Sequence, residues 1–159
     1  RVSRHDILQY VQREDSMIKV IENGDIFAIK ANAFCHGVNT KGIMGGLAGE
    51  VEKRFPDLAH LYRSMCELRQ LDGGDILPVL FDKWWIYNLV TQIEPGASAS
   101  LELIEQAFSK MIAHAEEHSV KSINVPKIGS GIGGLIWDDV FDVMQKLGTQ
   151  SQVVLNICI

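Results

Sequence analysis

The residues of this chain that point most clearly to a chemical function are four glycines in the segment Gly129-Ser130-Gly131-Ile132-Gly133-Gly134. The segment follows an apolar run typical of a buried strand and precedes an amphipathic helix with acidic residues in its first turns. A glycine loop in this position can turn its backbone N–H groups toward an anion, and the helix dipole adds positive charge there. The segment therefore predicts a phosphate-binding loop.

The same glycines fit the pattern G-x-G-x-x-G at positions 129, 131 and 134, which also marks dinucleotide-binding Rossmann domains. In those domains the pattern belongs to the first strand–helix turn, and an acidic residue follows about 20 positions later to bind the ribose. Here the glycines lie late in the sequence, and no Asp or Glu stands around Val153. A Rossmann site is therefore disfavoured, and a glycine connector without a ligand stays open as an alternative.

A second glycine loop, 42–46, lies between a predicted strand at 33–38 and a predicted helix that begins near Leu47. Ligands of open α/β sheets bind at the carboxyl ends of neighbouring strands, so two such loops can hold a diphosphate between them. The turn at 23–26 adds the carboxylate of Asp25, which can accept a hydrogen bond from the amino group of an adenine. An Asx turn or a helix cap is the alternative role for Asp25.

Alternating strands and helices must position these loops. Strands are predicted at 17–21, 33–38, 76–81, 84–90 and 153–159, with another around 123–128, and helices at 47–55, 58–65, 101–115 and from about 136 to 148. Residues 82–83 join two strands as a hairpin, and Pro78 predicts an edge or irregular strand because proline cannot donate a ladder hydrogen bond. The predicted fold class is α/β, a three-layer α/β/α sandwich with a mixed central sheet.

Length and charge bound the class of protein. The chain has 159 residues, 47% of them hydrophobic, which suits one α/β domain. Residues 1–16 are polar and are interpreted as an N-terminal extension, native or added for expression, so the single domain is assigned to 17–159. The net charge of −5 argues against broad electrostatic capture of nucleic acid or membrane. We expect neither sequence-specific nucleic-acid binding nor a membrane partner.

Cysteine and histidine usage gives no sign of a metal. Cys35, Cys66 and Cys158 lack C-x-x-C spacing, which favours a reducing, intracellular compartment, and the cytoplasm is the expected location. No run is long and apolar enough to predict a membrane span. His114 and His118 have helical i, i+4 spacing, but the two glutamates between them indicate a solvated face. No metal and no cofactor is expected.

Three separated motifs now carry a family resemblance, in this order: Gly24-Asp25-Ile26, the segment 35–48 that contains the first glycine loop, and the segment 126–137 that contains the second. In sequence and spacing they resemble a macrodomain over 17–159. The resemblance is strongest to the branch of terminal ADP-ribose–protein glycohydrolases, DNA ADP-ribosyl hydrolases and ADP-ribose 1″-phosphate phosphatases. It implies a macrodomain-like sandwich with ADP-ribose as its ligand.

The resemblance also implies contacts for individual residues. Asp25 would bind the adenine amino group, the Ile26 amide would face an adenine ring nitrogen, and Asn39 would lie beside the distal ribose. The two glycine loops would supply the remaining ligand contacts, from Gly45 and Gly46 at the distal ribose and pyrophosphate, and from Gly129, Ser130, Gly131, Ile132, Gly133 and Gly134 around the pyrophosphate.

The catalytic positions are where this chain departs from part of the family. Glycohydrolases of the branch use a lysine after the Leu-Val-Thr strand and an acid in the second glycine loop, and Gln92 and Gly133 stand there. Glutamine is no nucleophile, so the lysine-dependent mechanism is disfavoured. Phosphatase-like members show a His-x-x-Asn segment that resembles His36 and Asn39. These two are the candidate catalytic residues, His36 as general base or acid and Asn39 as the group that orients water.

Both candidates have a plainer alternative, a packed histidine and a turn asparagine. The sequence predicts a hydrolase of ADP-ribose derivatives that removes the phosphate of ADP-ribose 1″-phosphate or an ester-linked ADP-ribose on protein or nucleic acid. Its expected partners are ADP-ribose and an ADP-ribosylated macromolecule. A reader module that binds ADP-ribose without catalysis is the alternative.

Overall fold

The computed structural model describes residues 17–159, so the prediction of an extension at 1–16 lies outside the described residues. The elements in chain order are β1 (Ile18–Ile21), β2 (Ala33–Val38), α2 (Gly46–Arg54), α3 (Pro56–Glu67), β3 (Ile76–Phe81), β4 (Trp84–Val90), α4 (Leu101–Glu117), β5 (Ser122–Val125), α5 (Trp137–Gly148) and β6 (Val154–Cys158). They confirm the predicted order of strands and helices, with boundaries that agree to within a few residues.

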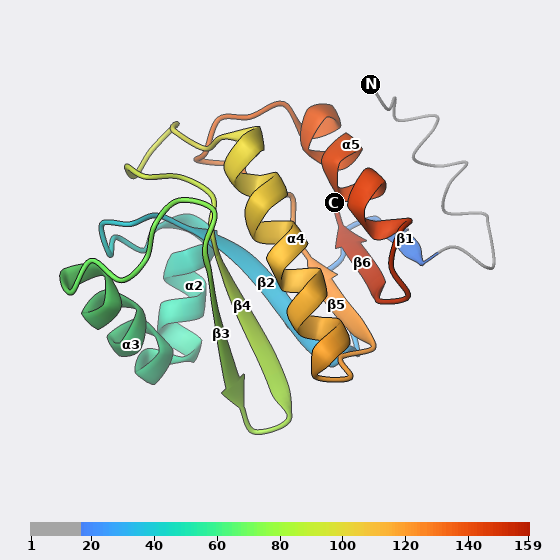
Figure 1. Ribbon diagram of the computed structural model, residues 1–159, viewed down its shortest axis with the longest axis horizontal. Coiled ribbons are helices and arrows are strands. Elements are labelled where there is room, and N and C mark those ends of the chain that lie inside the picture. Colours follow the sequence, from blue (N-terminus) through green and yellow to red (C-terminus); the bar gives the residue numbers. More distant parts are fainter. Residues whose placement is uncertain (1–16) are drawn as a thin grey trace.

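The six strands form one mixed sheet in the order β1-β6-β5-β2-β4-β3. Neighbours run parallel except β3 and β4, which form the predicted antiparallel hairpin. Strand β3 lies at the sheet edge, where Pro78 removes no ladder bond that a further strand would need. Helices α4 and α5 cover one face of the sheet and α2 and α3 the other, which confirms the three-layer sandwich (Figure 1).

Strand β2 is buried on both faces, and its side chains alternate between two cores. Ala33 and Cys35 join the large core under α4 and α5, whereas Phe34 packs with the smaller core on the α2 side. The ring of Phe34 lies 5.8 Å from that of Phe55, the residue between α2 and α3. Continuous apolar sequence in β2 is therefore what a central strand of this sandwich requires.

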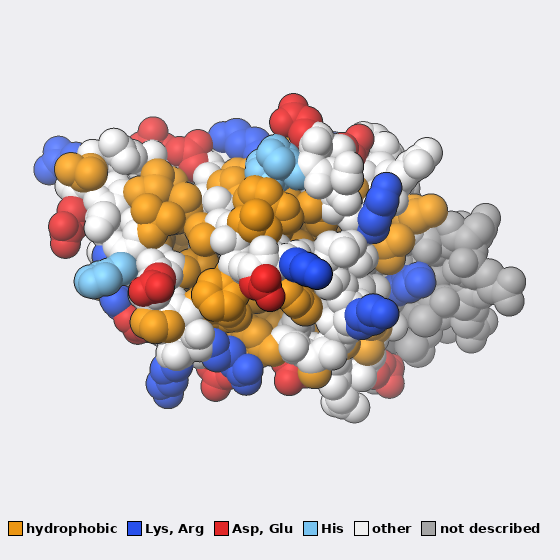
Figure 2. All heavy atoms as spheres, turned by 90° about the horizontal axis from the view of Figure 1, so that it is seen from below, with side chains coloured by type: hydrophobic (Ala, Val, Ile, Leu, Met, Phe, Trp, Pro, Cys, Tyr) orange, Lys and Arg blue, Asp and Glu red, His pale blue; other side chains and the backbone are white. Residues whose placement is uncertain are grey.

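Apolar side chains also reach the surface around the β3–β4 turn. Figure 2 views that end of the molecule, from below in Figure 1, and shows hydrophobic side chains gathered there. Leu80 and Phe81 are 54% and 50% exposed, and the Phe81 ring packs against Phe55 at 5.1 Å between centroids. This apolar surface continues the smaller core outward.

The parallel pairing of β2 with β5 brings the two glycine loops together. Ala33 faces Ile123 and Phe34 faces Asn124 in the register. Since parallel strands end at the same edge of a sheet, the loops that follow β2 and β5 emerge side by side. The predicted convergence of the two loops is confirmed.

A buried asparagine fastens a third segment to the same edge. The Asn124 side chain donates to the carbonyls of Ile26 at 3.0 Å and Ile29 at 2.7 Å, and its oxygen accepts from Asn156 at 3.0 Å. Asn124 has no exposed surface. The turn that carries Asp25 is thus held to the middle of the sheet by side-chain hydrogen bonds that span more than ninety positions of sequence.

Replacement of Asn124 by alanine tests this attachment. The variant leaves two inward-facing carbonyl groups without their donor, so we expect the free energy of unfolding to fall by about 2 to 4 kcal/mol. Urea unfolding followed by circular dichroism measures the change. Gln150→Ala, at an exposed position, is the control. A loss no larger in Asn124→Ala than in the control would contradict the proposed role of the buried amide.

Candidate ligand-binding site

A cleft of about 490 Å³ opens at the carboxyl ends of β2, β4 and β5. The first glycine loop forms one wall and the second forms the other. Of the predicted ligand residues, the structure places seven along this cleft: Asn39, Gly45, Gly46, Gly129, Gly131, Ile132 and Gly133. A diphosphate between two glycine loops is therefore sterically reasonable.

A second hollow, of about 350 Å³, lies beside Asp25 and Ile26. It shares Leu47 and Pro126 with the cleft, so the two hollows form one elongated depression. Asp25 Oδ1 accepts a hydrogen bond from the Phe27 amide at 2.9 Å, which is the Asx turn that the sequence left open. The other carboxylate oxygen makes no hydrogen bond within residues 17–159 and can accept one from a ligand.

Two positive φ angles shape the second loop. Gly129 has a φ of 73° and Gly134 a φ of 81°, a left-handed conformation that glycine adopts without strain. Ser130 and Gly134 do not line the cleft, and the Ser130 hydroxyl donates to the Ile128 carbonyl at 3.3 Å. The structure therefore gives these two residues a part in the loop's own conformation, and their predicted ligand contacts stay a prediction.

The two loops approach each other where Gly46 faces Ile132. A Cβ atom on Gly46 would lie 2.8 Å from Ile132 Cδ1, and Gly46 has a φ of 55°. Ile132 is 59% exposed, so its side chain reaches across the mouth of the cleft rather than into the core. Glycine at position 46 keeps the cleft open beneath that side chain.

Position 133 has no room for the acid that the family resemblance implies for a glycohydrolase. A Cβ atom there would lie 2.8 Å from Ala99 Cβ and 2.8 Å from the Gly129 carbonyl oxygen. Real Cβ atoms do not approach other atoms so closely, and one of these contacts is backbone. A carboxylate at position 133 would require the loop to move.

Most hydrogen bonds of the Asn39 side chain hold the first glycine loop in place. Its Oδ1 accepts from the Lys41 amide at 2.9 Å and from the Tyr62 hydroxyl at 3.1 Å, and its Nδ2 donates to the Ile43 carbonyl at 2.9 Å. The second hydrogen on Nδ2 makes no bond in the described part of the chain. Asn39 can thus give one hydrogen bond to a ligand while it fixes the loop.

Gln92 places an amide at the end of the cleft, where the family resemblance implies a lysine for a glycohydrolase. Gln92 donates both hydrogens of Nε2, to the Glu94 carbonyl at 2.7 Å and to the Gly96 carbonyl at 2.8 Å. It therefore shapes the loop after β4 and has no lone pair for attack. Lys127 is the one ionisable side chain among the described residues that line the cleft.

His36 does not reach the cleft. Its ring is fully buried on β2, is absent from the cleft lining, and lies with Nε2 at 2.6 Å from Asn88 Oδ1. Burial lowers the pKa of His36 to about 4, although the hydrogen bond to Asn88 acts in the opposite direction. The geometry does not support the predicted role as general base, because no ring nitrogen faces solvent or a substrate. The packed histidine that the sequence left open fits better.

Other sequence features have structural roles. The rings of His114 and His118 stack at 3.8 Å, and His114 Nδ1 lies 2.8 Å from the Tyr87 hydroxyl. Within residues 17–159 no three His, Cys, Asp or Glu side chains gather as a metal site would require, and no helix there is long and apolar enough to cross a bilayer.

Sequence reasoning missed several residues of the depression. Thr91 and Gly96 line the cleft after β4, and Phe27 and Arg54 flank Asp25. The Arg54 guanidinium carbon lies 4.1 Å from the centroid of the Phe27 ring. Thr91 had a usable signal, because it follows directly on a strand predicted in the same sheet, whereas Arg54 is brought in from the end of α2 by tertiary packing.

The fold and the site define an α/β domain with an elongated depression at the carboxyl ends of its strands. Comparison with known proteins identifies the family, since the Macro domain model matches residues 35–144. This chain belongs to the macrodomain family, as the sequence motifs predicted.

Three relatives show what the chain is similar to within that family. A DNA ADP-ribosyl glycohydrolase of Thermus aquaticus is 29% identical over 130 residues, which are 77% of this chain and 36% of the relative. The macrodomain of Mycobacterium tuberculosis DarG is 28% identical, with a TM-score of 0.78 over 90% of this chain and 97% of that one. The human ADP-ribose glycohydrolase OARD1 is 23% identical over 91% of this chain and 92% of its own length. The chain spans less than half of the first of these relatives.

The placement of His36 predicts how stability depends on pH. Its folded-state pKa of about 4 lies below the ordinary 6.5, so between these values the unfolded chain binds a proton that the folded chain does not. Stability from this group is complete above pH 6.5 and is lost as the pH falls toward 4. We expect His36 to account for about 2 to 3 kcal/mol of the loss between pH 7 and pH 4.5.

Urea unfolding of the unmodified chain and of His36→Gln at these two pH values isolates that loss. The variant should lose less stability on acidification and should bind ADP-ribose unchanged at pH 7. A variant with normal stability and normal binding, but without turnover, would restore His36 as the catalytic base.

Proposed function

We propose that the depression binds ADP-ribose along its length. The observation that carries this proposal is the continuity of the Asp25 hollow with a cleft walled by two glycine loops. Adenine fits the first hollow, where the unused Asp25 oxygen can accept from its amino group. The diphosphate fits between the loops, where backbone N–H groups and Lys127 offset its charge. The distal ribose then lies toward Asn39 and Gln92.

We further propose that the bound ADP-ribosyl group is released from a conjugate by hydrolysis. The names of the relatives support an ADP-ribosyl hydrolase. A lysine nucleophile is missing at Gln92, so the reaction we favour is attack by water on an ester or on the phosphate of ADP-ribose 1″-phosphate. Asn39 can hold such a water with its remaining N–H, and the glycine-loop amides can stabilise developing negative charge.

A reader without catalytic activity is the second candidate. One observation favours it specifically, since the cleft lining in residues 17–159 contains no carboxylate and no histidine beside its single lysine. General acid–base catalysis then has no group within reach unless the substrate supplies one.

The conjugate is proposed to be an ADP-ribosylated macromolecule, with DNA favoured by the names of the first relatives. The three free cysteines fit a reducing compartment, and the cytoplasm is the proposed location. No sequence-specific contact to bases is proposed.

Gly131→Ala is a clean probe of the ligand. No protein atom lies within 4 Å of the new Cβ, and the backbone there is not left-handed, so stability should not change. If a phosphate approaches this backbone, the methyl group should weaken ADP-ribose binding about tenfold or more. Isothermal titration gives the affinity, and a thermal melt checks the fold. Unchanged affinity would place the diphosphate elsewhere.

Asp25→Ala tests the adenine end. Loss of a hydrogen bond to a charged acceptor should weaken ADP-ribose binding about tenfold or more, and should weaken the binding of ribose 5-phosphate much less. Asp57→Ala, an exposed acid in the first turn of α3, is the matched control. Equal effects of the two variants would refute the assignment of Asp25.

Turnover separates hydrolase from reader. Incubation with ADP-ribose 1″-phosphate, ADP-ribosylated protein and ADP-ribosylated DNA, followed by chromatography, should show release from at least one of them. Asn39→Ala should then lower kcat about a hundredfold. Tyr62→Phe removes a bond to the same loop but keeps the Asn39 amide, so its kcat should fall far less. Tight ADP-ribose binding without release from any of these substrates would contradict the hydrolase and favour the non-catalytic reader module.

A further inference from the structure

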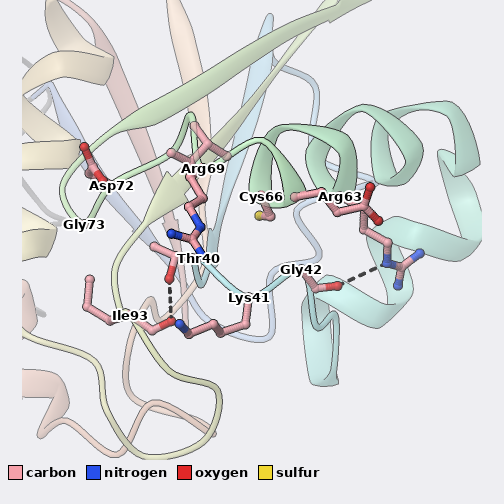
Figure 3. Close-up of a pocket in the computed structure, with 11 residues that line it drawn as sticks. Thr40, Lys41, Gly42, Arg63, Cys66, Arg69, Asp72, Gly73 and Ile93 are labelled. Carbon is pink, nitrogen blue, oxygen red and sulfur yellow. Dashed lines mark hydrogen bonds between the residues drawn. The ribbon is translucent and has the colours of Figure 1, made fainter.

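A larger cavity, of about 670 Å³, opens on the far side of the first loop from the cleft (Figure 3). Thr40 and Ile93 line it, and their neighbours in the chain, Asn39 and Gln92, line the end of the cleft. The two hollows therefore meet at the same two strand ends, after β2 and after β4. A group attached to a distal ribose at the proposed position would lie near this boundary.

The wall between the hollows is preformed. Thr40 donates to the Ile93 carbonyl through its hydroxyl at 2.9 Å and through its amide at 3.1 Å. Arg63 Nε donates to the Gly42 carbonyl at 3.1 Å, which ties the loop to α3 (Figure 3). A ligand in the larger cavity would thus meet a fixed surface.

Three cations line this cavity, and their bonds differ. Arg63 is paired with Glu52 as well as with the loop. Lys41 Nζ lies 3.5 Å from Glu94 Oε1, but both side chains are largely exposed, so water and salt weaken the pair. The Arg69 side chain makes no hydrogen bond and no ion pair within residues 17–159.

Arg69 is also aimed into the cavity. It follows α3 in a left-handed conformation, with a φ of 54°, which glycine adopts more readily at this position. Figure 3 shows its guanidinium directed toward the part of the cavity where Thr40 lies. An unpaired guanidinium offers a fork of N–H donors that suits a phosphate.

The cavity has an apolar side and an acidic rim as well. Ile93 is 44% exposed and offers a flat apolar surface next to the cations. Glu67 and Asp72 lie on the rim, and their charge repels a phosphate from that side. A phosphate is therefore confined to the region of Arg69 and Thr40, and a base can lie against Ile93.

We propose that this cavity binds the nucleotide to which the ADP-ribosyl group is attached, in a single nucleic-acid strand. Arg69 holds a backbone phosphate of that strand, and Ile93 packs against the base. The inference rests on the proposed function, since the depression must hold ADP-ribose for its conjugate to reach the cavity. It needs only local positive charge, so it agrees with the net charge of −5.

Binding measurements with four probes test the inference. The probes are ADP-ribose, a short single-stranded DNA carrying one ADP-ribosyl group, the same DNA without it, and an ADP-ribosylated peptide. The modified DNA should displace fluorescent ADP-ribose about tenfold more tightly than ADP-ribose does, or show a correspondingly lower KM if it is cleaved. Arg69→Glu should abolish this gain, and Arg69→Ala should lower the salt slope by about one.

The control variant is Lys83→Ala, which removes an exposed cation at the β3–β4 turn. It should keep the gain, and every variant should bind ADP-ribose itself unchanged. Equal affinity for modified DNA and ADP-ribose would overturn the inference and leave the proposed function standing. A gain in affinity shown by the ADP-ribosylated peptide instead of the DNA, and removed by Asp72→Asn, would also overturn the inference. Failure of ADP-ribose itself to bind would overturn the proposed function and the inference with it.

Discussion

The pairing of β2 with β5 is the constraint on which the site depends. Only two residue pairs define its register, yet it sets two glycine loops side by side although they are more than eighty positions apart in the chain. The core below is mostly apolar, so the polar groups of both loops are best satisfied at the sheet edge, by each other, by water or by a ligand. Asn124 lies in the same register and carries the Asp25 turn to that edge.

The helices and strands could be predicted from the sequence, because hydrophobic periodicity and the missing N–H of Pro78 are local properties of the chain. The glycine loops could be predicted as well, since few other residues tolerate a φ of 73° at Gly129. The environment of His36 was not predictable in the same way. Its partner Asn88 is 52 positions away, and the burial that lowers its pKa depends on the packing of the folded chain. The alternation in β2 did contain a hint, because His36 shares a face with the core residues Phe34 and Val38.

Local packing explains why two positions of the site carry no reactive side chain. Gly133 is surrounded by Ala99 and by Gly129 of its own loop, so the loop reaches its compact form without a side chain there. The Gln92 amide nitrogen donates both of its hydrogens to carbonyl groups of the loop that follows β4. Both positions serve the shape of the cleft instead of its reactivity. A macrodomain can keep its ligand geometry in this way while its chemistry changes.

The first loop acts as a partition, since one strip of chain faces the cleft through Asn39 and the larger cavity through Thr40 and Lys41. The hydroxyl of Tyr62, a buried residue of α3, donates to the Asn39 carbonyl at 2.7 Å and holds this strip to the helix. A displacement of the strip by an occupant on one side changes the shape of the other side. Thermodynamic linkage then requires that each occupant alters the affinity for its neighbour by the same factor.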